Sequence, residues 1–123
     1  MIETSIKKLR DPFLLKENGV YYLYGTGVDT DNNWNRTQYA CYKNTSGKLD
    51  GAWEKVENLY KKPENGEKNF WAPEVHKYKG NFYMFTTYFS SVTQKRGSTI
   101  LRSTSPEGPF TEITNGTITP SDW

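Results

Sequence analysis

Short apolar runs alternate with turn residues from the start of the chain, which is the pattern of β-strands joined by tight turns. Residues 13–15 are apolar, residues 17–19 contain the pair Asn18-Gly19, and residues 20–24 are aromatic or β-branched. Asn and Gly adopt the positive φ that a two-residue hairpin turn requires, so we expect a β-hairpin here. The segment Gly25-Thr26-Gly27 is predicted to end its second strand.

Two more strands are predicted before the pattern starts again. Residues 37–43 form the third strand and residues 51–56 the fourth, with a turn-rich connection between them. The polar stretch 29–36, which contains Trp34, is predicted to be a loop, and residues 61–68 a polar linker. No segment has the sustained periodicity and capping residues of a helix, so the predicted fold class is all-β.

The same order of strand and turn residues then recurs further along the chain. At a spacing of 61 positions, Pro12 aligns with Pro73, Gly19 with Gly80, Tyr22 with Tyr83 and Tyr24 with Phe85. At spacings of 59 and 57 positions, residues 43–46 align with 102–105 and residues 51–53 with 108–110. The decreasing spacing indicates small deletions in loops between strands that form the repeating unit.

Repeated units of four short strands are typical of propeller blades. A β-sandwich or an unrelated series of hairpins has turn signals at a similar spacing and is the alternative. We predict one blade at about residues 9–60, a second at about 69–116, and a linker at 117–123 that leads into a third blade outside this sequence. Two blades leave two sheet faces open, so we expect the chain to associate with itself or with the missing blades.

Composition narrows the possible functions. Hydrophobic residues make up 34% of the 123 residues and aromatic residues 15%, which argues against a disordered chain. The net charge is only +2 and the lysines are scattered, so we expect no nucleic-acid partner, although aromatic platforms for single strands are a weaker alternative.

No apolar run is long enough to span a membrane, and we expect no membrane association. No signal peptide is recognisable, which leaves the location open between the cytoplasm and a mature secreted fragment.

Cys41 is the one cysteine of the chain. A single cysteine forms no internal disulfide and lacks the spacing of a cysteine metal site, so no metal site is predicted. We expect Cys41 to be a half-buried residue of the third strand.

Two carboxylates stand where the geometry of a blade would expose them. Asp11 begins the innermost strand of the first unit and Glu74 that of the second. Innermost strands line the axis of a propeller, so residues at their entrance face the central pocket. Enzymes that cleave sugars need carboxylates at fixed separation and aromatic faces for the sugar rings. A turn or capping role beside Pro12 is the alternative for Asp11.

Three groups of residues together resemble one known family. They are Leu9–Phe13 followed by Gly19–Thr26, Phe70–Val75 followed by Gly80–Tyr83, and Ser98–Ser105 followed by Gly108–Phe110. This pattern resembles glycoside hydrolase family 43 over nearly the whole chain, and Trp71-Ala72-Pro73-Glu74 is its most specific part. The resemblance implies a five-bladed β-propeller, of which about two blades are present, that hydrolyses arabinose- or xylose-containing plant glycans with inversion.

The resemblance also implies roles for individual residues. Asp11 matches the general base, whereas the general acid and the carboxylate that tunes its pKa belong to the third and fourth blades of the family, so we expect the chain not to be active alone. Glu74 is expected to contact substrate. Trp71 and Phe70 are either part of a sugar platform or core residues between blades. Trp34, in its polar loop, is a further platform candidate that no motif places.

No cofactor is expected to be required. A structural calcium is compatible with the whole family fold, but no ligands for it are identifiable in this sequence. The expected partner is a glycan. A non-catalytic carbohydrate-binding module and a structural β domain are the alternative functions.

Overall fold

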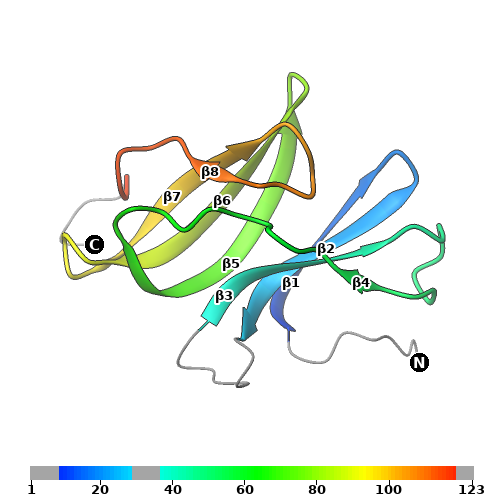
Figure 1. The fold of residues 1–123 in the computed structure, drawn as a ribbon, viewed down its shortest axis with the longest axis horizontal. Helices are drawn as coiled ribbons and strands as arrows, with labels where there is room; N and C mark the ends of the chain where they lie inside the picture. Colours follow the sequence, from blue (N-terminus) through cyan, green and yellow to red (C-terminus); the bar gives the residue numbers. More distant parts are fainter. Residues whose placement is uncertain (1–8, 29–36, 119–123) are drawn as a thin grey trace.

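A computed structural model of the chain describes residues 9–28 and 37–118, which form two four-stranded antiparallel sheets (Figure 1). Trp34 lies outside the described residues. The first sheet contains β1 (Leu9–Glu17), β2 (Val20–Val28), β3 (Thr37–Asn44) and β4 (Glu54–Lys55), and the second contains β5 (Gly66–Tyr78), β6 (Asn81–Ser90), β7 (Arg96–Ser103) and β8 (Thr111–Glu112). In each sheet the strands follow one another in chain order. The all-β prediction, with units of four antiparallel strands that match propeller blades, is confirmed.

Tight turns join the first two strands of each sheet. Asn18-Gly19 connects β1 to β2 and Lys79-Gly80 connects β5 to β6, and all four residues have positive φ. That backbone conformation is the one whose twist matches the flanking strands in a two-residue hairpin. The hairpin predicted from Asn18-Gly19 is therefore confirmed.

Strand pairing confirms that the two sheets are copies of one unit. In the first sheet Tyr22 is opposite Lys43, which is opposite Glu54. In the second sheet Tyr83 is opposite Arg102, which is opposite Thr111. Equivalent residues are 61 positions apart on β2 and β6, 59 apart on β3 and β7, and 57 apart on β4 and β8. Each spacing in the sequence therefore corresponds to one pair of equivalent strands.

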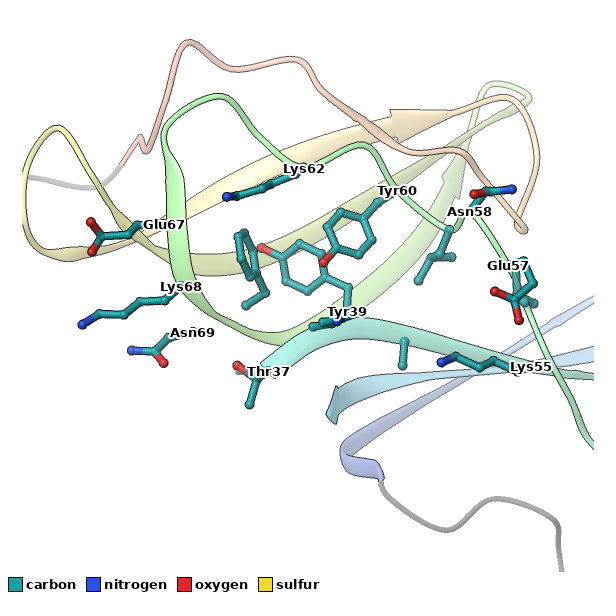
Figure 2. A pocket seen from close by; sticks show the side chains of 15 residues that line it. Thr37, Tyr39, Lys55, Glu57, Asn58, Tyr60, Lys62, Glu67, Lys68 and Asn69 are labelled. Carbon is teal, nitrogen blue, oxygen red and sulfur yellow. The ribbon is translucent and has the colours of Figure 1, made fainter. Parts of the chain in front are cut away.

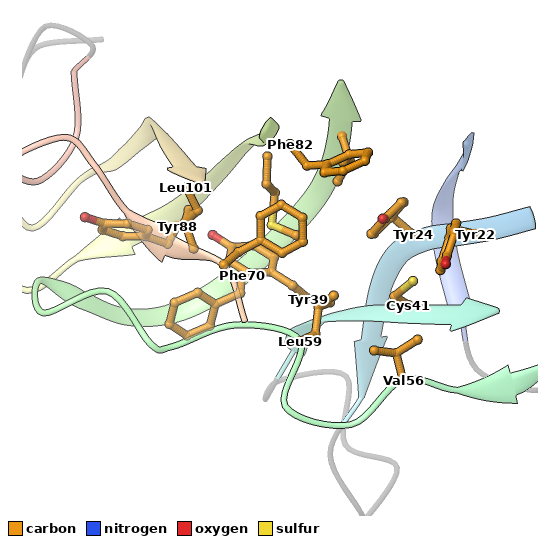
Figure 3. Close-up of a cluster of buried hydrophobic side chains, with 13 residues drawn as sticks. Tyr22, Tyr24, Tyr39, Cys41, Val56, Leu59, Phe70, Phe82, Tyr88 and Leu101 are labelled. Atoms are coloured by element: carbon orange, nitrogen blue, oxygen red, sulfur yellow. The ribbon is translucent and has the colours of Figure 1, made fainter. Parts of the chain in front are cut away.

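One face of the first sheet packs on the innermost strand of the second. β5 lies against β1, β2 and β3. Tyr24 and Cys41 from the first sheet and Val75, Met84 and Leu101 from the second are completely buried. Figure 3 shows side chains of both sheets meeting in this one core. Cys41 is thus more deeply buried than the half-buried position expected for it, because its side chain faces the second sheet and not solvent.

Tyrosine hydroxyls connect the sheets across this core. Tyr24 donates a hydrogen bond to the carbonyl of Pro106, and Tyr39 donates one to the carbonyl of Thr87. A buried tyrosine needs such a partner for its polar end. The aromatic-rich composition therefore serves the junction between the sheets.

The connection between the sheets is also hydrogen-bonded to the second sheet. The amide of Phe110 donates to the carbonyl of Leu59 at 2.8 Å, and the amide of Lys61 donates to the carbonyl of Phe110 at 2.9 Å. Gly108 makes this approach possible, because a Cβ there would lie 2.0 Å from the Leu59 carbonyl oxygen. The stretch predicted as a linker at residues 61–68 is shorter in the structure, since β5 begins at Gly66.

Strand β2 is longer than the sequence predicts. β2 continues to Val28, past the glycines that were predicted to end it, because Gly27 and Thr26 pair with Leu9 and Arg10 of β1.

Within residues 9–28 and 37–118 no helix is long and apolar enough to cross a membrane.

Buried tyrosines predict alkaline unfolding. Burial raises the pKa of Tyr22 to about 12, with a further contribution from Glu107, and burial raises that of Tyr60 to about 12. Burial also raises the pKa of Tyr24, Tyr39 and Tyr88. An unfolded tyrosine loses its proton near pH 10.0, so these groups stabilise the folded chain fully below pH 10 and progressively less toward pH 12.

We expect the free energy of unfolding to fall between pH 10 and pH 12, with tyrosinate absorbance rising in the same transition as the loss of sheet signal in circular dichroism. Ionisation of all tyrosines near pH 10 with the sheet signal intact would contradict this.

Candidate active site

A β-bulge interrupts the innermost strand of each sheet at the same place. Asp11 and Pro12 together face Gly25, since Arg10 pairs with Thr26 and Phe13 with Tyr24. A bulge of this kind redirects a side chain and is frequent beside active sites. The structure therefore gives the acid before Pro12 a specific geometry, which supports the active-site interpretation over a simple turn residue.

The second sheet repeats the bulge with different side chains. Ala72 and Pro73 together face Thr86, between the pairs Trp71–Thr87 and Glu74–Phe85. The φ angle is 51° at Asp11 and 54° at Ala72, a left-handed conformation that costs a non-glycine residue about 1–3 kcal/mol. Such strain persists only where surrounding contacts enforce it, and it is found mostly at functional sites.

The residue opposite the bulge differs between the sheets for a steric reason. A Cβ on Gly25 would lie 2.6 Å from the carbonyl oxygen of Arg10. Thr86 has the equivalent place in the second sheet, where its hydroxyl donates to the carbonyl of Trp71 at 2.6 Å. The first bulge is thus packed directly on its neighbouring strand, and the second is held by a side-chain hydrogen bond.

Thr26 connects the two bulges. Its Oγ1 accepts a hydrogen bond from the amide of Ala72 at 2.7 Å and makes a long contact of 3.5 Å, as donor, to Oδ2 of Asp11. Because a hydroxyl both accepts and donates, one side chain satisfies the strained backbone of the second sheet and orients the carboxylate of the first. Thr26 is thus the residue that contacts both bulges, with a normal hydrogen bond to Ala72 and a long contact to Asp11.

Asp11 and Glu74 line one shallow pocket of about 250 Å³ between the innermost strands. Its walls are the bulge segments Asp11–Phe13 and Ala72–Glu74. Both carboxylates are exposed to solvent. The sequence predicts that both acids face the central pocket of a propeller, and their roles there stay a prediction. In this pocket Glu74 lies two positions after the place equivalent to Asp11.

Trp71 is half exposed, and one face of its ring is covered. The guanidinium of Arg96 lies 3.5 Å from the centre of the Trp71 ring. Arg96 is fixed there by hydrogen bonds from Nη1 to the carbonyl of Asn69 at 3.1 Å and to Oγ1 of Thr87 at 2.9 Å. A sugar ring stacking on Trp71 would therefore use the opposite face of the indole.

Phe70 has the second of the two roles considered for it. It is 6% exposed, and its ring packs 5.3 Å from Tyr39 and 6.0 Å from Tyr88. A ring that is 6% exposed and packed among other aromatic rings offers too little surface for a sugar to stack on. Phe70 is thus a core residue between the sheets, and its assignment to the sugar platform is corrected.

A larger groove of about 540 Å³ lies elsewhere, at the outer junction of the sheets (Figure 2). The rings of Tyr39, Tyr60 and Phe70 contribute to its floor, and neither Asp11 nor Glu74 lines it. Thr37 also lines it, and its buried Oγ1 has no hydrogen-bond partner in the described part of the chain.

Three residues of the site were not identified from the sequence. In the sequence Thr26 marks only a predicted strand end, Ala72 occurs only as a member of the motif at residues 71–74, and no motif contains Arg96. The repeat does contain a signal for Ala72, because it aligns with Asp11 at the spacing of 61. Nothing in the sequence indicates that Arg96 stacks on Trp71, since this contact joins separate strands. In the described residues no group of three or more His, Cys, Asp or Glu side chains is placed to hold a metal ion.

The role of Thr26 predicts a difference between two similar substitutions. Thr26→Val removes the acceptor for the amide of Ala72, and the loss of one such hydrogen bond costs about 0.5–1.5 kcal/mol. Thr37→Val removes a buried hydroxyl that has no partner among the described residues, so its effect on stability should be near zero or favourable. Chemical denaturation of the two variants measures this difference. Equal losses of stability would show that the hydroxyl of Thr26 does not connect the sheets.

Comparisons with known proteins agree with this geometry. The family model described as glycosyl hydrolases family 43 matches residues 4–123. An endo-arabinase from Bacteroides thetaiotaomicron VPI-5482 is 38% identical, with a TM-score of 0.70, over 95% of this chain and 38% of that one. A thermostable family-43 glycoside hydrolase is 28% identical, with a TM-score of 0.75, over 90% of this chain and 34% of that one. An endo-1,4-beta-xylanase from Bacteroides thetaiotaomicron VPI-5482 is 26% identical, with a TM-score of 0.68, over 92% of this chain and 35% of that one.

Among curated proteins no match was found. The chain spans between 34% and 38% of the length of the three solved structures, so it corresponds to a portion of their fold. The family match covers almost the whole chain, and it agrees with the two blade-like sheets and the acid on the first bulge. The chain belongs to glycosyl hydrolase family 43.

Proposed function

We propose that the chain is part of an inverting glycoside hydrolase that acts on arabinose- or xylose-containing plant glycans, and that Asp11 is its general base. The observation that carries this proposal is the position of Asp11 on a strained bulge of the innermost strand, with an exposed carboxylate at a pocket between the sheets. Family membership supplies the reaction class. The similarity to an endo-arabinase and an endo-1,4-beta-xylanase supports the two sugars.

A general base must be ionised and must reach the attacking water. The Asp11 carboxylate is exposed to solvent, and the Thr26 hydroxyl lies 3.5 Å from its Oδ2. Inversion requires a general acid about 6.5–9.5 Å from the base, which leaves room for the water. We assign the acid and the carboxylate that tunes its pKa to further blades, so the 123 residues alone are inactive under this proposal.

Glu74 and Trp71 are proposed to bind the sugar. Glu74 shares the pocket of Asp11, and its carboxylate accepts hydrogen bonds from sugar hydroxyls. Trp71 is 40% exposed, and the indole face opposite Arg96 is suited to stacking on a sugar ring. Trp34 stays a prediction as a platform residue. No cofactor is assigned to the reaction, and a structural calcium in the whole fold also stays a prediction.

The proposal includes a protein partner in addition to the glycan. Each sheet packs on the other with one face and leaves its second face open, with Leu14 45% exposed on the first sheet and Phe85 43% exposed on the second. Blades gain much of their stability from neighbours on both faces. We propose association with another copy of the chain or with further blades.

The base assignment predicts a large and specific loss of turnover. In the longest polypeptide that the coding sequence specifies, Asp11→Asn should lower kcat by about 10²–10⁴-fold on aryl arabinofuranoside or aryl xyloside, with KM nearly unchanged. Glu64→Gln, an exposed acid outside the pocket, is the matched control and should keep full activity. A loss in Asp11→Asn no larger than in the control would remove Asp11 from the role of base.

The same assay on the 123-residue chain tests its proposed inactivity. No sugar should be released from either substrate. Turnover that disappears in Asp11→Asn would contradict the inactivity while supporting the assignment of the base.

A carbohydrate-binding module is the second candidate, favoured by the half-exposed Trp71. It predicts glycan affinity that survives Asp11→Asn and is lost in Trp71→Ala or Trp34→Ala, measured by isothermal titration with arabino- and xylo-oligosaccharides. A structural β domain, in contrast, predicts no response to any of these glycans.

A further inference from the structure

The two open sheet faces carry different sets of apolar side chains. On the second sheet Tyr83, Phe85, Ile100 and Ile113 form what we call the head face, with Phe85 43% and Ile113 46% exposed. On the first sheet Leu14, Tyr21, Leu23 and Tyr42 form what we call the tail face, with Leu14 45% exposed. All of these residues lie on strands except Ile113, which directly follows β8.

Each open face is the structural equivalent of a face that is already packed. The head face occupies the positions that Tyr22, Tyr24, Cys41 and Val56 occupy in the first sheet. Those four residues are at most 7% exposed, because they pack against the second sheet. The match includes the backbone, since Val56 donates to the carbonyl of Cys41 and Ile113 donates to the carbonyl of Ile100, both at 2.9 Å.

The tail face is equivalent to the other half of the same interface. Its positions correspond to those of Val75, Phe82, Met84 and Leu101 in the second sheet. Those side chains are at most 4% exposed, because they pack against the first sheet. The chain therefore exposes both halves of an interface that it also contains in packed form.

We propose that the tail face of a second copy of this chain packs on the head face of the first, in the arrangement by which the two sheets already pack within one chain. The two faces are different surfaces, so the contact is head-to-tail. A head-to-tail contact leaves one head and one tail free in every dimer, and growth continues until a ring closes or a filament forms. This inference concerns association only and stands whether or not the proposed enzymatic function is correct.

Charged residues support the second copy as the occupant. Within the chain Lys43 of the first sheet forms a salt bridge of 3.0 Å with Glu107 in the connection between β7 and β8, and Tyr22 donates to Glu107 at 3.4 Å. The spacings of 59 and 57 make Arg102 equivalent to Lys43, and Asp50 equivalent to Glu107. Arg102 and Asp50 are both exposed and have opposite charge. The proposed contact thus pairs Arg102 of one copy with Asp50 of the next.

A second charged pair of the packed interface is not repeated at the proposed contact. Lys77 forms a salt bridge of 3.1 Å with Glu17 across the packed interface. The equivalent positions at the proposed contact are Lys16 and Tyr78. Tyr78 is 60% exposed, but the ammonium of Lys79 already lies 5.3 Å from the centre of its ring, so Lys16 gains no new partner there.

The test uses two single variants, each of which disables one face. Phe85→Asp places a carboxylate in the head face, and Leu14→Asp places one in the tail face. Burying an unpaired carboxylate is strongly unfavourable, so each variant alone should weaken association by more than about tenfold in sedimentation velocity, relative to the unmodified chain. Val92→Asp, an exposed apolar residue in the turn after β6, is the matched control and should associate normally.

The decisive measurement is on the mixture of the two variants. Phe85→Asp retains an intact tail face and Leu14→Asp an intact head face, so the mixture should form one-to-one dimers that grow no further. Circular dichroism of each variant checks that its sheets are intact.

A charge exchange tests the proposed register. Arg102→Glu and Asp50→Lys should each weaken association severalfold, and the chain carrying both changes should recover it. The proposal is overturned if the folded chain stays monomeric at every concentration. Binding of further blades, added as a separate polypeptide, would not rescue it. It is equally overturned if association persists in Phe85→Asp and Leu14→Asp alone, or if their mixture fails to form dimers.

Discussion

The packing of one aromatic sheet face onto β5 is the interaction on which the rest of the structure depends. Tyr24 and Cys41 are completely buried there, and the Tyr24 hydroxyl donates to the carbonyl of Pro106 in the connection between β7 and β8. Burial of this face brings together two innermost strands that are far apart in the sequence. The pocket between them exists only because the sheets pack in this way, so Asp11 and Glu74 meet as a consequence of a hydrophobic contact.

The two bulges have the same backbone conformation but carry different side chains in the two copies of the repeat. Both sheets accept a left-handed residue before proline, at Asp11 and at Ala72. Only the first copy has a carboxylate there, and only the first has a glycine opposite the bulge. The second copy has an alanine whose amide is bound by Thr26. One copy therefore presents the acid, and the other provides part of the support that orients it.

The repeat also explains why the chain has two unlike open faces. Stacked blades each use two different surfaces, one for the preceding neighbour and one for the next. Two consecutive blades satisfy one such contact and leave half of another at each end. The residues left exposed, such as Leu14 and Phe85, are those whose counterparts Val75 and Tyr24 form the core. Their exposure follows from the repeat itself.

Much of the architecture was predictable from the sequence, because it depends on local chemistry. The turn residues Asn18-Gly19, the alternating aromatic runs and the spacing of 61 positions determined the hairpins, the all-β class and the two repeated units. Asp11 was identifiable because an acid, a proline and a strand follow one another directly in the chain. Such signals need no knowledge of distant contacts.

Tertiary structure decided what depends on residues far apart in the chain. Phe70 and Trp71 are adjacent in sequence and similar in chemistry, yet Phe70 is 6% exposed and Trp71 40%. Successive side chains of a strand point to opposite faces, and only the position of the neighbouring sheet determines which face is covered. The stacking of Arg96 on Trp71 and the link from Thr26 to Ala72 likewise join separate strands. The sequence by itself determined the repeating unit and its acid, whereas packing between the sheets decided which aromatic ring remains available to a ligand.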